Sequence, residues 1–295
     1  MDLEVIGAKK TQGQMGFYAS EFMSNKTSSS RATKATPKLL IGMVHVGALP
    51  GTPRGRLSVP QLAKEAAREA SVLVKAGFGA LLLENMHDAP YVAEGHGPEI
   101  TAGMTAAALA IREAVGDVVM GVQVLARGER EALAVALAAN CQFIRCENFV
   151  FSHVADEGLM VTASAGSLLR YRRQIGAQGV KIMCDLKKKH ASHAITADVS
   201  LEDAIHATEF FGGDGVIVTG TATGKPVRIE DVRAARNASS LPVWVGSGVT
   251  PELIPTLVPL VDGLIVGSYL KKGGHWAGAL DTKRCTQVLK AFERA

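Results

Sequence analysis

Short apolar runs alternate with longer segments of mixed polarity from residue 39 to the end of the chain. The runs are almost continuously hydrophobic, which is typical of parallel strands that are covered on both faces. We therefore expect strands at residues 39–46, 80–86, 118–125, 142–149, 180–187, 215–220, 242–248 and 263–270.

The segments between these runs have the periodicity of amphipathic helices. In residues 59–77, for example, Leu62, Ala66 and Leu73 fall on one stripe and the charged residues lie elsewhere. Glycines such as Gly77 and Gly116 stand where helices commonly stop. The predicted helices cover residues 59–77, 98–116, 128–140, 164–176, 200–212, 228–239, 250–261 and 279–294.

Repeated strand–helix units determine the expected fold class. Eight such units in about 255 residues predict an α/β protein built as a single (β/α)8 TIM barrel. An open, doubly wound sheet is the alternative, and it would need a G-x-G-x-x-G turn after the first strand. Residues 47–51 read Gly-Ala-Leu-Pro-Gly and do not fit that turn.

A segment of different composition precedes the barrel. Residues 23–38 are rich in Ser, Thr and Lys, contain no acid and have few large apolar side chains. We expect residues 1–38 to form a flexible, disordered N-terminal tail and residues 39–295 to form the barrel domain. Organelle transit peptides have a similar composition. We therefore predict a cytoplasmic protein, with a mitochondrial or other organelle location as the alternative if the tail is a targeting segment.

Net charge excludes some classes of partner. The chain carries +4 overall, and residues 1–38 hold six basic against three acidic residues, which leaves 26 against 25 in residues 39–295. A nucleic-acid-binding domain has a concentrated basic face, so we expect no nucleic-acid partner. No apolar run approaches the ~20 residues of a membrane span. The four cysteines have no metal-binding spacing and indicate reduced thiols in an intracellular protein.

The sharpest local motif follows the last two predicted strands. The strand ends read Val-Gly-Ser-Gly-Val at 245–249 and Val-Gly-Ser at 266–268. Loops after the seventh and eighth strands form the usual phosphate site of TIM barrels, because glycines let backbone N–H groups approach the anion closely. The predicted phosphate-binding residues are Gly246, Ser247, Gly248, Gly267 and Ser268.

Polar residues stand at the carboxyl ends of the other strands, where the chemistry of TIM barrels is located. Four of these residues can exchange protons at a reacting centre. The predicted catalytic residues are His45, Glu84, Glu147 and Asp185. The predicted substrate-binding residues are Asn85, Asp88, Arg145, Asn148, Lys187 and Thr219.

The dipeptide Glu-Asn occurs at the ends of both the second and the fourth strand, at 84–85 and 147–148. Alternate strands contribute side chains to the same inward layer of a barrel. Two carboxylates at one level can share a proton, hold a metal or act as an acid–base pair. The alternative is that Glu147 simply pairs with the nearby Arg145.

Two other chemistries are open. A metal-dependent hydrolase would use His45, Glu84, Asp88 and Asp185, but the His- and acid-containing loop at 87–97 fits no established ligand spacing. We therefore predict no cofactor and no metal ligand, with a divalent metal as the alternative. Three lysines follow the fifth strand at 187–189. A lysine there can form a Schiff base, whereas a lysine run is also typical of a solvated loop.

Motifs in the same order resemble those of the BtpA family over residues 39–295. The resemblance rests on 42–51 (GMVHVGALPG), on Glu84-Asn85 with Asp88 and Pro90, on Glu157-Gly158, on 185–191 (DLKKKHA), on 218–220 with Thr223-Gly224, on 245–250 (VGSGVT) and on 262–268 (DGLIVGS) followed by Lys271. One departure lies at 277–281, which reads Ala-Gly-Ala-Leu-Asp where the family tends to have Asn-Pro-Val-Asp. Because of this difference, a ligand-binding role for the segment is less well supported, although Asp281 still matches the family motif.

The resemblance implies a barrel similar to the ribulose-phosphate-binding barrels, in agreement with the phosphate motif. The bacterial founder of the family is linked to photosystem I biogenesis or stability, and relatives also occur where there is no photosynthesis. The resemblance implies fold and anion site more directly than it implies a reaction.

Three functions follow from these observations. The first is an enzyme that acts on a phosphorylated sugar or ribosyl-type metabolite by acid–base chemistry, as an isomerase, lyase or glycosyl hydrolase. The second is a non-catalytic assembly or stability factor, and the third is the metal-dependent hydrolase. The alanine-rich segments 103–110 and 132–139 offer flat surfaces for a homo-oligomer, although the same small residues suit packing on the barrel.

Overall fold

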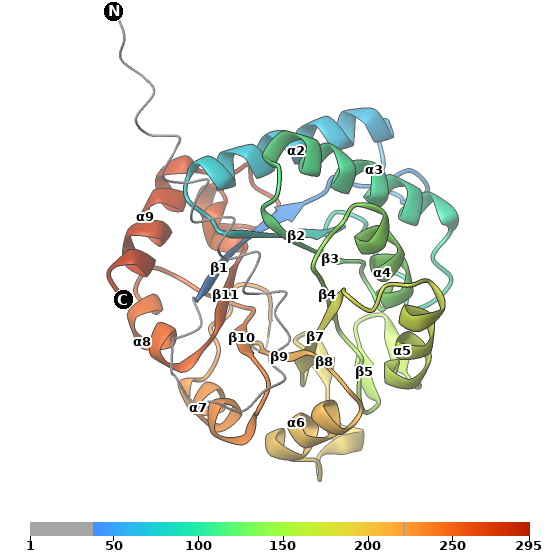
Figure 1. Ribbon diagram of the computed structural model, residues 1–295, viewed down its shortest axis with the longest axis vertical. Coiled ribbons are helices and arrows are strands. Elements are labelled where there is room, and N and C mark those ends of the chain that lie inside the picture. Colours follow the sequence, from blue (N-terminus) through green and yellow to red (C-terminus); the bar gives the residue numbers. More distant parts are fainter. Residues whose placement is uncertain (1–37, 221) are drawn as a thin grey trace, which may run out of the picture.

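Eight parallel strands close into a barrel in the computed structural model, which describes residues 38–220 and 222–295 (Figure 1). The closed order β1-β11-β10-β9-β7-β4-β3-β2 confirms the predicted (β/α)8 TIM barrel. Apart from Lys38, the predicted tail lies outside the described residues. The barrel strands are β1 (Leu39–His45), β2 (Ala80–Glu84), β3 (Val119–Gln123), β4 (Phe143–Cys146), β7 (Lys181–Leu186), β9 (Gly215–Val218), β10 (Val243–Val245) and β11 (Gly263–Val266).

Helices surround the barrel, one after each strand (Figure 1). They are α2 (Val59–Lys75), α3 (Pro98–Val115), α4 (Glu129–Ala138), α5 (Ala165–Gln174), α6 (Leu201–Phe210), α7 (Ile229–Ala238), α8 (Ile254–Leu257) and α9 (Thr282–Glu293). Within the described ranges, no helix is both long enough and apolar enough to cross a membrane.

The seventh predicted helix, at 250–261, is much shorter than expected. It consists of α8 followed by a 3-10 turn over Val258–Leu260. Proline stands in the first turn of each piece, at Pro255 and Pro259. Because proline has no N–H to donate and its ring clashes with the preceding turn, one continuous helix is interrupted there.

The barrel interior is packed with large apolar side chains. The residues that point inward alternate along each strand, as the two-residue period of a strand requires. They are Leu39, Ile41, Met43, Ala80, Leu82, Val119, Phe143, Met183, Ile217, Trp244 and Ile265, all buried in one cluster. Glycines on neighbouring strands make room for the largest of them: a Cβ at Gly121 would lie 2.1 Å from the Phe143 ring, and one at Gly215 would lie 2.1 Å from Met183.

The same alternation continues to the carboxyl ends of the strands, where the inward residues become polar. Two residues beyond Met43, Leu82, Phe143 and Met183 stand His45, Glu84, Arg145 and Asp185, and His45 is in register with Glu84. The corresponding inward positions of β10 and β11 are Gly246 and Gly267. An apolar interior therefore carries a polar layer that is open above the last two strands.

A small antiparallel sheet lies beyond the barrel strands, where the sequence predicted only loops. It consists of β5 (His153–Ala155), β6 (Gly158–Met160) and β8 (Ala191–Ser192), in the order β6-β5-β8. The first two strands follow β4 and the third follows β7. This sheet therefore joins the two loops that emerge from adjacent barrel strands.

Glycine at position 121 should be essential to the packing of the barrel interior. We expect Gly121→Val to lower the free energy of unfolding by about 2 kcal/mol or more, because the added side chain must displace the buried Phe143 ring. Urea denaturation measures the change. Gly166→Ala on α5 is the matched control, since its Cβ meets only the flexible end of Arg170, and it should be neutral or stabilising. Equal losses from both variants would contradict this account.

Candidate functional site

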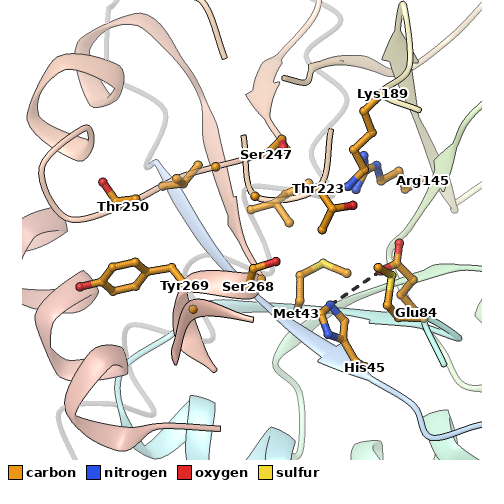
Figure 2. Close-up of a pocket in the computed structure, with 18 of the residues that line it drawn as sticks. Met43, His45, Glu84, Arg145, Lys189, Thr223, Ser247, Thr250, Ser268 and Tyr269 are labelled. Carbon is orange, nitrogen blue, oxygen red and sulfur yellow. Dashed lines mark ion pairs between the residues drawn. The ribbon is translucent and has the colours of Figure 1, made fainter. Parts of the chain in front are cut away.

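A cavity of about 160 Å³ opens at the carboxyl ends of the strands, above the apolar interior. Its walls come from the ends of β1, β2 and β4, from the loops after β7, β9, β10 and β11, and from the first turn of α9 (Figure 2). The side chains on its two sides differ in chemistry. One side consists of glycines and hydroxyl residues, and the other contains His45, Glu84, Arg145 and Lys189.

Glycines and serines of the loops after β10 and β11 form the first side, and we call this the cradle. All five predicted phosphate-binding residues line the cavity. Gly248 has a φ of +62°, and a Cβ there would lie 2.4 Å from the backbone of Lys225, so only glycine fits. The Ser247 hydroxyl lies 3.0 Å from the Lys225 carbonyl oxygen and 3.1 Å from that of Ala222, so its proton is used within the loop after β9. The cradle therefore offers chiefly backbone and the Ser268 hydroxyl.

A cation that the sequence did not nominate completes the cradle. Arg284, in the first turn of α9, lines the cavity and lies with its guanidinium 4.1 Å from the centre of the Tyr269 ring. The lysines after the last strand do not serve this purpose: Lys271 is buried and pairs with Glu69 of α2, and Lys272 is exposed and does not line the cavity. The sequence carries no clear signal for Arg284, because Asp281 caps the same helix end and already supplies an anion there.

His45 and Glu84 are the acid–base candidates that face the cavity. The Nε2 of His45 lies 3.7 Å from Oε2 of Glu84, and Nδ1 lies 3.1 Å from the carbonyl oxygen of Trp276 (Figure 2). A carbonyl oxygen only accepts, so Nδ1 carries the proton and Nε2 carries the lone pair. Burial, with a contribution from Lys271, lowers the pKa of His45 to about 3, and burial raises the pKa of Glu84.

A buried ion pair holds Arg145 and Asp185 together. The guanidinium Nε and Nη2 of Arg145 donate to the two carboxylate oxygens of Asp185 at 2.8 and 2.9 Å. Arg145 lines the cavity, while its bidentate partner from the adjacent strand β7 does not. Asp185 is therefore placed to orient Arg145 rather than to touch a ligand.

Glu147 faces a second, smaller cavity of about 30 Å³. It accepts from Nζ of Lys188 at 3.3 Å and from the backbone N–H of Arg127 at 3.2 Å. The alternative pairing of Glu147 with Arg145 is wrong, because Arg145 is bonded to Asp185. The two Glu-Asn carboxylates therefore face different cavities.

The two asparagines and Asp88 brace loops. Asn85 accepts from the backbone N–H of Leu125 at 2.7 Å and donates to Asp88 at 2.8 Å, and Asp88 also accepts from the N–H of Leu49 at 2.8 Å. Asn148 donates to the carbonyl oxygen of Thr162 at 2.9 Å. Each asparagine follows its glutamate by one residue, which in a strand turns the side chain to the opposite face.

Two further predicted binding residues also lie outside the larger cavity. Lys187 is exposed and donates to the carbonyl oxygen of Val199 at 2.7 Å. Thr219 has a buried hydroxyl with no hydrogen-bond partner among the described residues. The lysine that does line the cavity is Lys189, two residues further along the same run, together with Thr223 from the loop after β9.

The residues considered for a metal do not converge. Asp88 accepts from Leu49 and Asn85, and Asp185 is held by Arg145, so neither joins His45 and Glu84. In residues 38–220 and 222–295, no three His, Cys, Asp or Glu side chains form a group suited to a metal ion.

Comparisons with known proteins extend over almost the whole barrel. The model of the BtpA family matches residues 36–294. An uncharacterized mitochondrial protein of Caenorhabditis elegans is 41% identical over 265 residues, which is 88% of this chain and 95% of that one. The photosystem I biogenesis protein BtpA of Synechocystis is 33% identical over 262 residues, 88% of this chain and 90% of that one.

Solved structures share the fold at low sequence identity. Phosphoribosyl anthranilate isomerase from Thermus thermophilus has a TM-score of 0.54 at 13% identity, covering 87% of this chain and 98% of its own. A 3-hexulose-6-phosphate synthase has the same TM-score and identity, covering 86% and 99%. These structural similarities show that the proteins share the barrel fold. The family model and the similar sequences show in addition that the chain belongs to the BtpA family.

Proposed function

We propose that this protein is an enzyme that acts on a phosphorylated sugar or ribosyl-type metabolite by acid–base chemistry. The observation that carries the proposal is that one cavity joins the cradle to His45, Glu84 and Arg145. A ligand with a phosphate at one end and hydroxyl or carbonyl groups at the other matches these two sides. The barrels of similar fold include proteins named as an isomerase and a synthase of phosphorylated compounds, which agrees with this class of substrate.

Each group has a role that its surroundings support. Backbone N–H groups at Gly248 and Gly267 would hold the phosphate with the Ser268 hydroxyl and the Arg284 guanidinium, because the N–H of Gly246 already donates to the carbonyl oxygen of Val218 at 3.0 Å. Glu84, whose pKa is raised by burial, would give and take the proton of the reaction.

Other groups would position the ligand and the reacting groups. His45 would offer the lone pair of Nε2, and Arg145, held by Asp185, would orient the substrate. Glu147 would act only indirectly, through Lys188.

The non-catalytic alternative explains the site less well. An assembly factor would have its carboxylates consumed by ion pairs, as Glu147 and Asp185 are. Glu84 differs, because its nearest ionisable partner is the neutral His45 at 3.7 Å, and both side chains line the cavity. Burying a carboxylate without a hydrogen-bonded cation is costly. The enzyme proposal explains why this cost is tolerated, because burial raises the pKa of a carboxyl that has to exchange protons.

Binding of phosphorylated compounds tests the cradle. Ribose 5-phosphate and inorganic phosphate should raise the Tm of the wild type, whereas ribose should not. We expect Ser268→Asp, which places a carboxylate in the cradle, to weaken ribose 5-phosphate binding at least tenfold, or about 1.4 kcal/mol, measured by calorimetry. This variant is preferable to Gly248→Asp, which would also strain the backbone.

Thr256→Asp adds the same charge at an exposed position on α8 and serves as the control. It should bind ribose 5-phosphate as the wild type does. Failure of every phosphorylated compound to bind the wild type would remove the proposal and favour the assembly factor.

Histidine 45 should make the protein less stable in mild acid. Because its pKa is lowered to about 3 in the folded chain, protonation favours the unfolded chain, and stability is lost as pH falls below about 6.5. Between pH 7 and pH 5 the wild type should lose about 2 kcal/mol more unfolding free energy than His45→Gln. Urea denaturation at the two pH values measures the difference. Identical pH dependence of the two proteins would show that His45 is not held neutral.

We also propose an organelle location. The name of the similar worm protein includes the word mitochondrial, and residues 23–38 of the present chain are basic, Ser- and Thr-rich and free of acid. A fluorescent fusion of the full chain should then enter mitochondria, and a fusion that begins at Leu39 should stay in the cytoplasm. The same distribution for both fusions would favour the cytoplasmic alternative.

A further inference from the structure

Three consecutive lysines after β7 have three different surroundings. Lys187 is exposed and donates to the carbonyl oxygen of Val199. Lys188 is buried and pairs with Glu147 at 3.3 Å and with Glu157 at 3.7 Å. Lys189 lines the large cavity. Of these three lysines, which in the sequence are typical of a solvated loop, only Lys189 therefore reaches the larger cavity.

The amine of Lys189 has no counter-ion. Among the described residues it donates no hydrogen bond and forms no ion pair, although its side chain reaches toward the Arg145 guanidinium (Figure 2). Arg145 is already satisfied by Asp185 and offers only its positive charge. Burial first, and Arg145 next, lower the pKa of Lys189, and the more weakly acting carboxylates of Glu84, Asp185 and Glu147 only partly oppose this shift. A desolvated lysine beside another cation loses its proton readily and becomes a nucleophile.

Both neighbours of Lys189 anchor the loop that carries it. On one side, Lys188 is tied to Glu147 and Glu157. On the other, Nε2 of His190 accepts from the backbone N–H of Thr223 at 2.9 Å, which joins the loop after β7 to the loop after β9. The backbone that carries Lys189 is therefore anchored on both sides of this residue.

Glu84 and the cradle complete the arrangement. Glu84 and Lys189 line the same cavity, on the side away from Ser268 and Tyr269 (Figure 2). The positive charges of Lys189 and Arg145 oppose the effect of burial, which raises the pKa of Glu84. A compound anchored by its phosphate in the cradle would direct its other end toward Lys189 and Glu84.

We propose that Lys189 forms an imine with the aldehyde or ketone carbonyl of a phosphorylated substrate. This inference rests on the proposed function, because the cradle must hold the phosphate. The neutral amine attacks the carbonyl carbon to form a C–N bond, while the C=O π pair moves to oxygen. One proton of the attacking nitrogen passes to that oxygen, the Glu84 carboxylic acid supplies a second, and the oxygen leaves as water while the nitrogen lone pair forms the C=N bond.

The products of this step are a protonated imine and the Glu84 carboxylate. The carboxylate then takes a proton from the carbon next to the imine, and the electron pair of that C–H bond moves toward nitrogen. The Glu84 carboxylic acid then returns the proton to a carbon of the resulting enamine, which restores the protonated imine. Addition of water to this imine releases the lysine amine and the carbonyl compound, and the proton that is left over passes to the Glu84 carboxylate. The substrate class is therefore a phosphorylated aldose or ketose in its open form.

Reductive trapping tests the proposal. Full-length protein is incubated with glyceraldehyde 3-phosphate or dihydroxyacetone phosphate and sodium cyanoborohydride, and adducts are located by intact mass and peptide mapping. We expect one predominant adduct, on Lys189, that excess inorganic phosphate suppresses. Lys189→Arg keeps the cation and removes the nucleophile, so it should reduce trapping at least tenfold, while Lys187→Arg should leave the adduct unchanged.

The outcomes separate this proposal from the preceding one. Adducts spread over surface lysines, with no excess on Lys189, would overturn the imine even if phosphate raises the Tm of the same protein. Tight phosphate binding that depends on Lys189 charge, with no adduct, would show that the lysine is an anion ligand instead. Absence of phosphate binding would overturn the proposed function. Mapping of the wild type alone decides the point if Lys189→Arg does not fold.

Discussion

The buried pair of Arg145 and Asp185 organises the upper layer of this barrel. Two charges in a low-dielectric interior are tolerated only with close geometry, here two parallel hydrogen bonds of 2.8 and 2.9 Å across adjacent strands. Removing either partner from such a pair typically costs about 3–5 kcal/mol, since the other charge is left uncompensated. Both carboxylate oxygens of Asp185 accept hydrogen bonds from Arg145, whose guanidinium also lines the cavity. The charge of this guanidinium adds to burial in lowering the pKa of Lys189, and it opposes the effect of burial, which raises the pKa of Glu84.

The strands and the cradle could be predicted from the sequence because their signals are local. A continuous apolar run identifies a buried parallel strand wherever it occurs. The Gly-Ser-Gly and Gly-Ser motifs at the ends of the last two strands indicate in the same way that the backbone can approach a ligand closely, and all five of these residues line the cavity. The two-residue period also separates Glu84 from Asn85, so the inward residue at a strand end is predictable once the register is known.

Partners of the charged groups could not be predicted, because they depend on contacts between distant segments. Nothing near Glu147 in the sequence indicates that Lys188, 41 residues away, is its partner. The sequence favours Lys187 over Lys189 because Lys187 stands closer to the strand end. Lys187 and His190, however, adopt positive φ values of 45° and 55°, so the alternation of the strand ends there. Arg284 lies on the last helix and reaches the cavity only when the barrel closes.

The barrel is nearly neutral overall, so its attraction for a phosphorylated ligand has to be generated locally. In the cavity, Arg145 is matched by Asp185, His45 is neutral and Glu84 has a raised pKa, which leaves Arg284 and Lys189 as the cations without a carboxylate partner among the described lining residues. They stand with different groups, Arg284 at the cradle and Lys189 beside Arg145. A guanidinium stays protonated under all ordinary conditions, whereas an amine beside a cation need not. The cation at the cradle is therefore suited to a permanent anion, and the lysine is suited to chemistry.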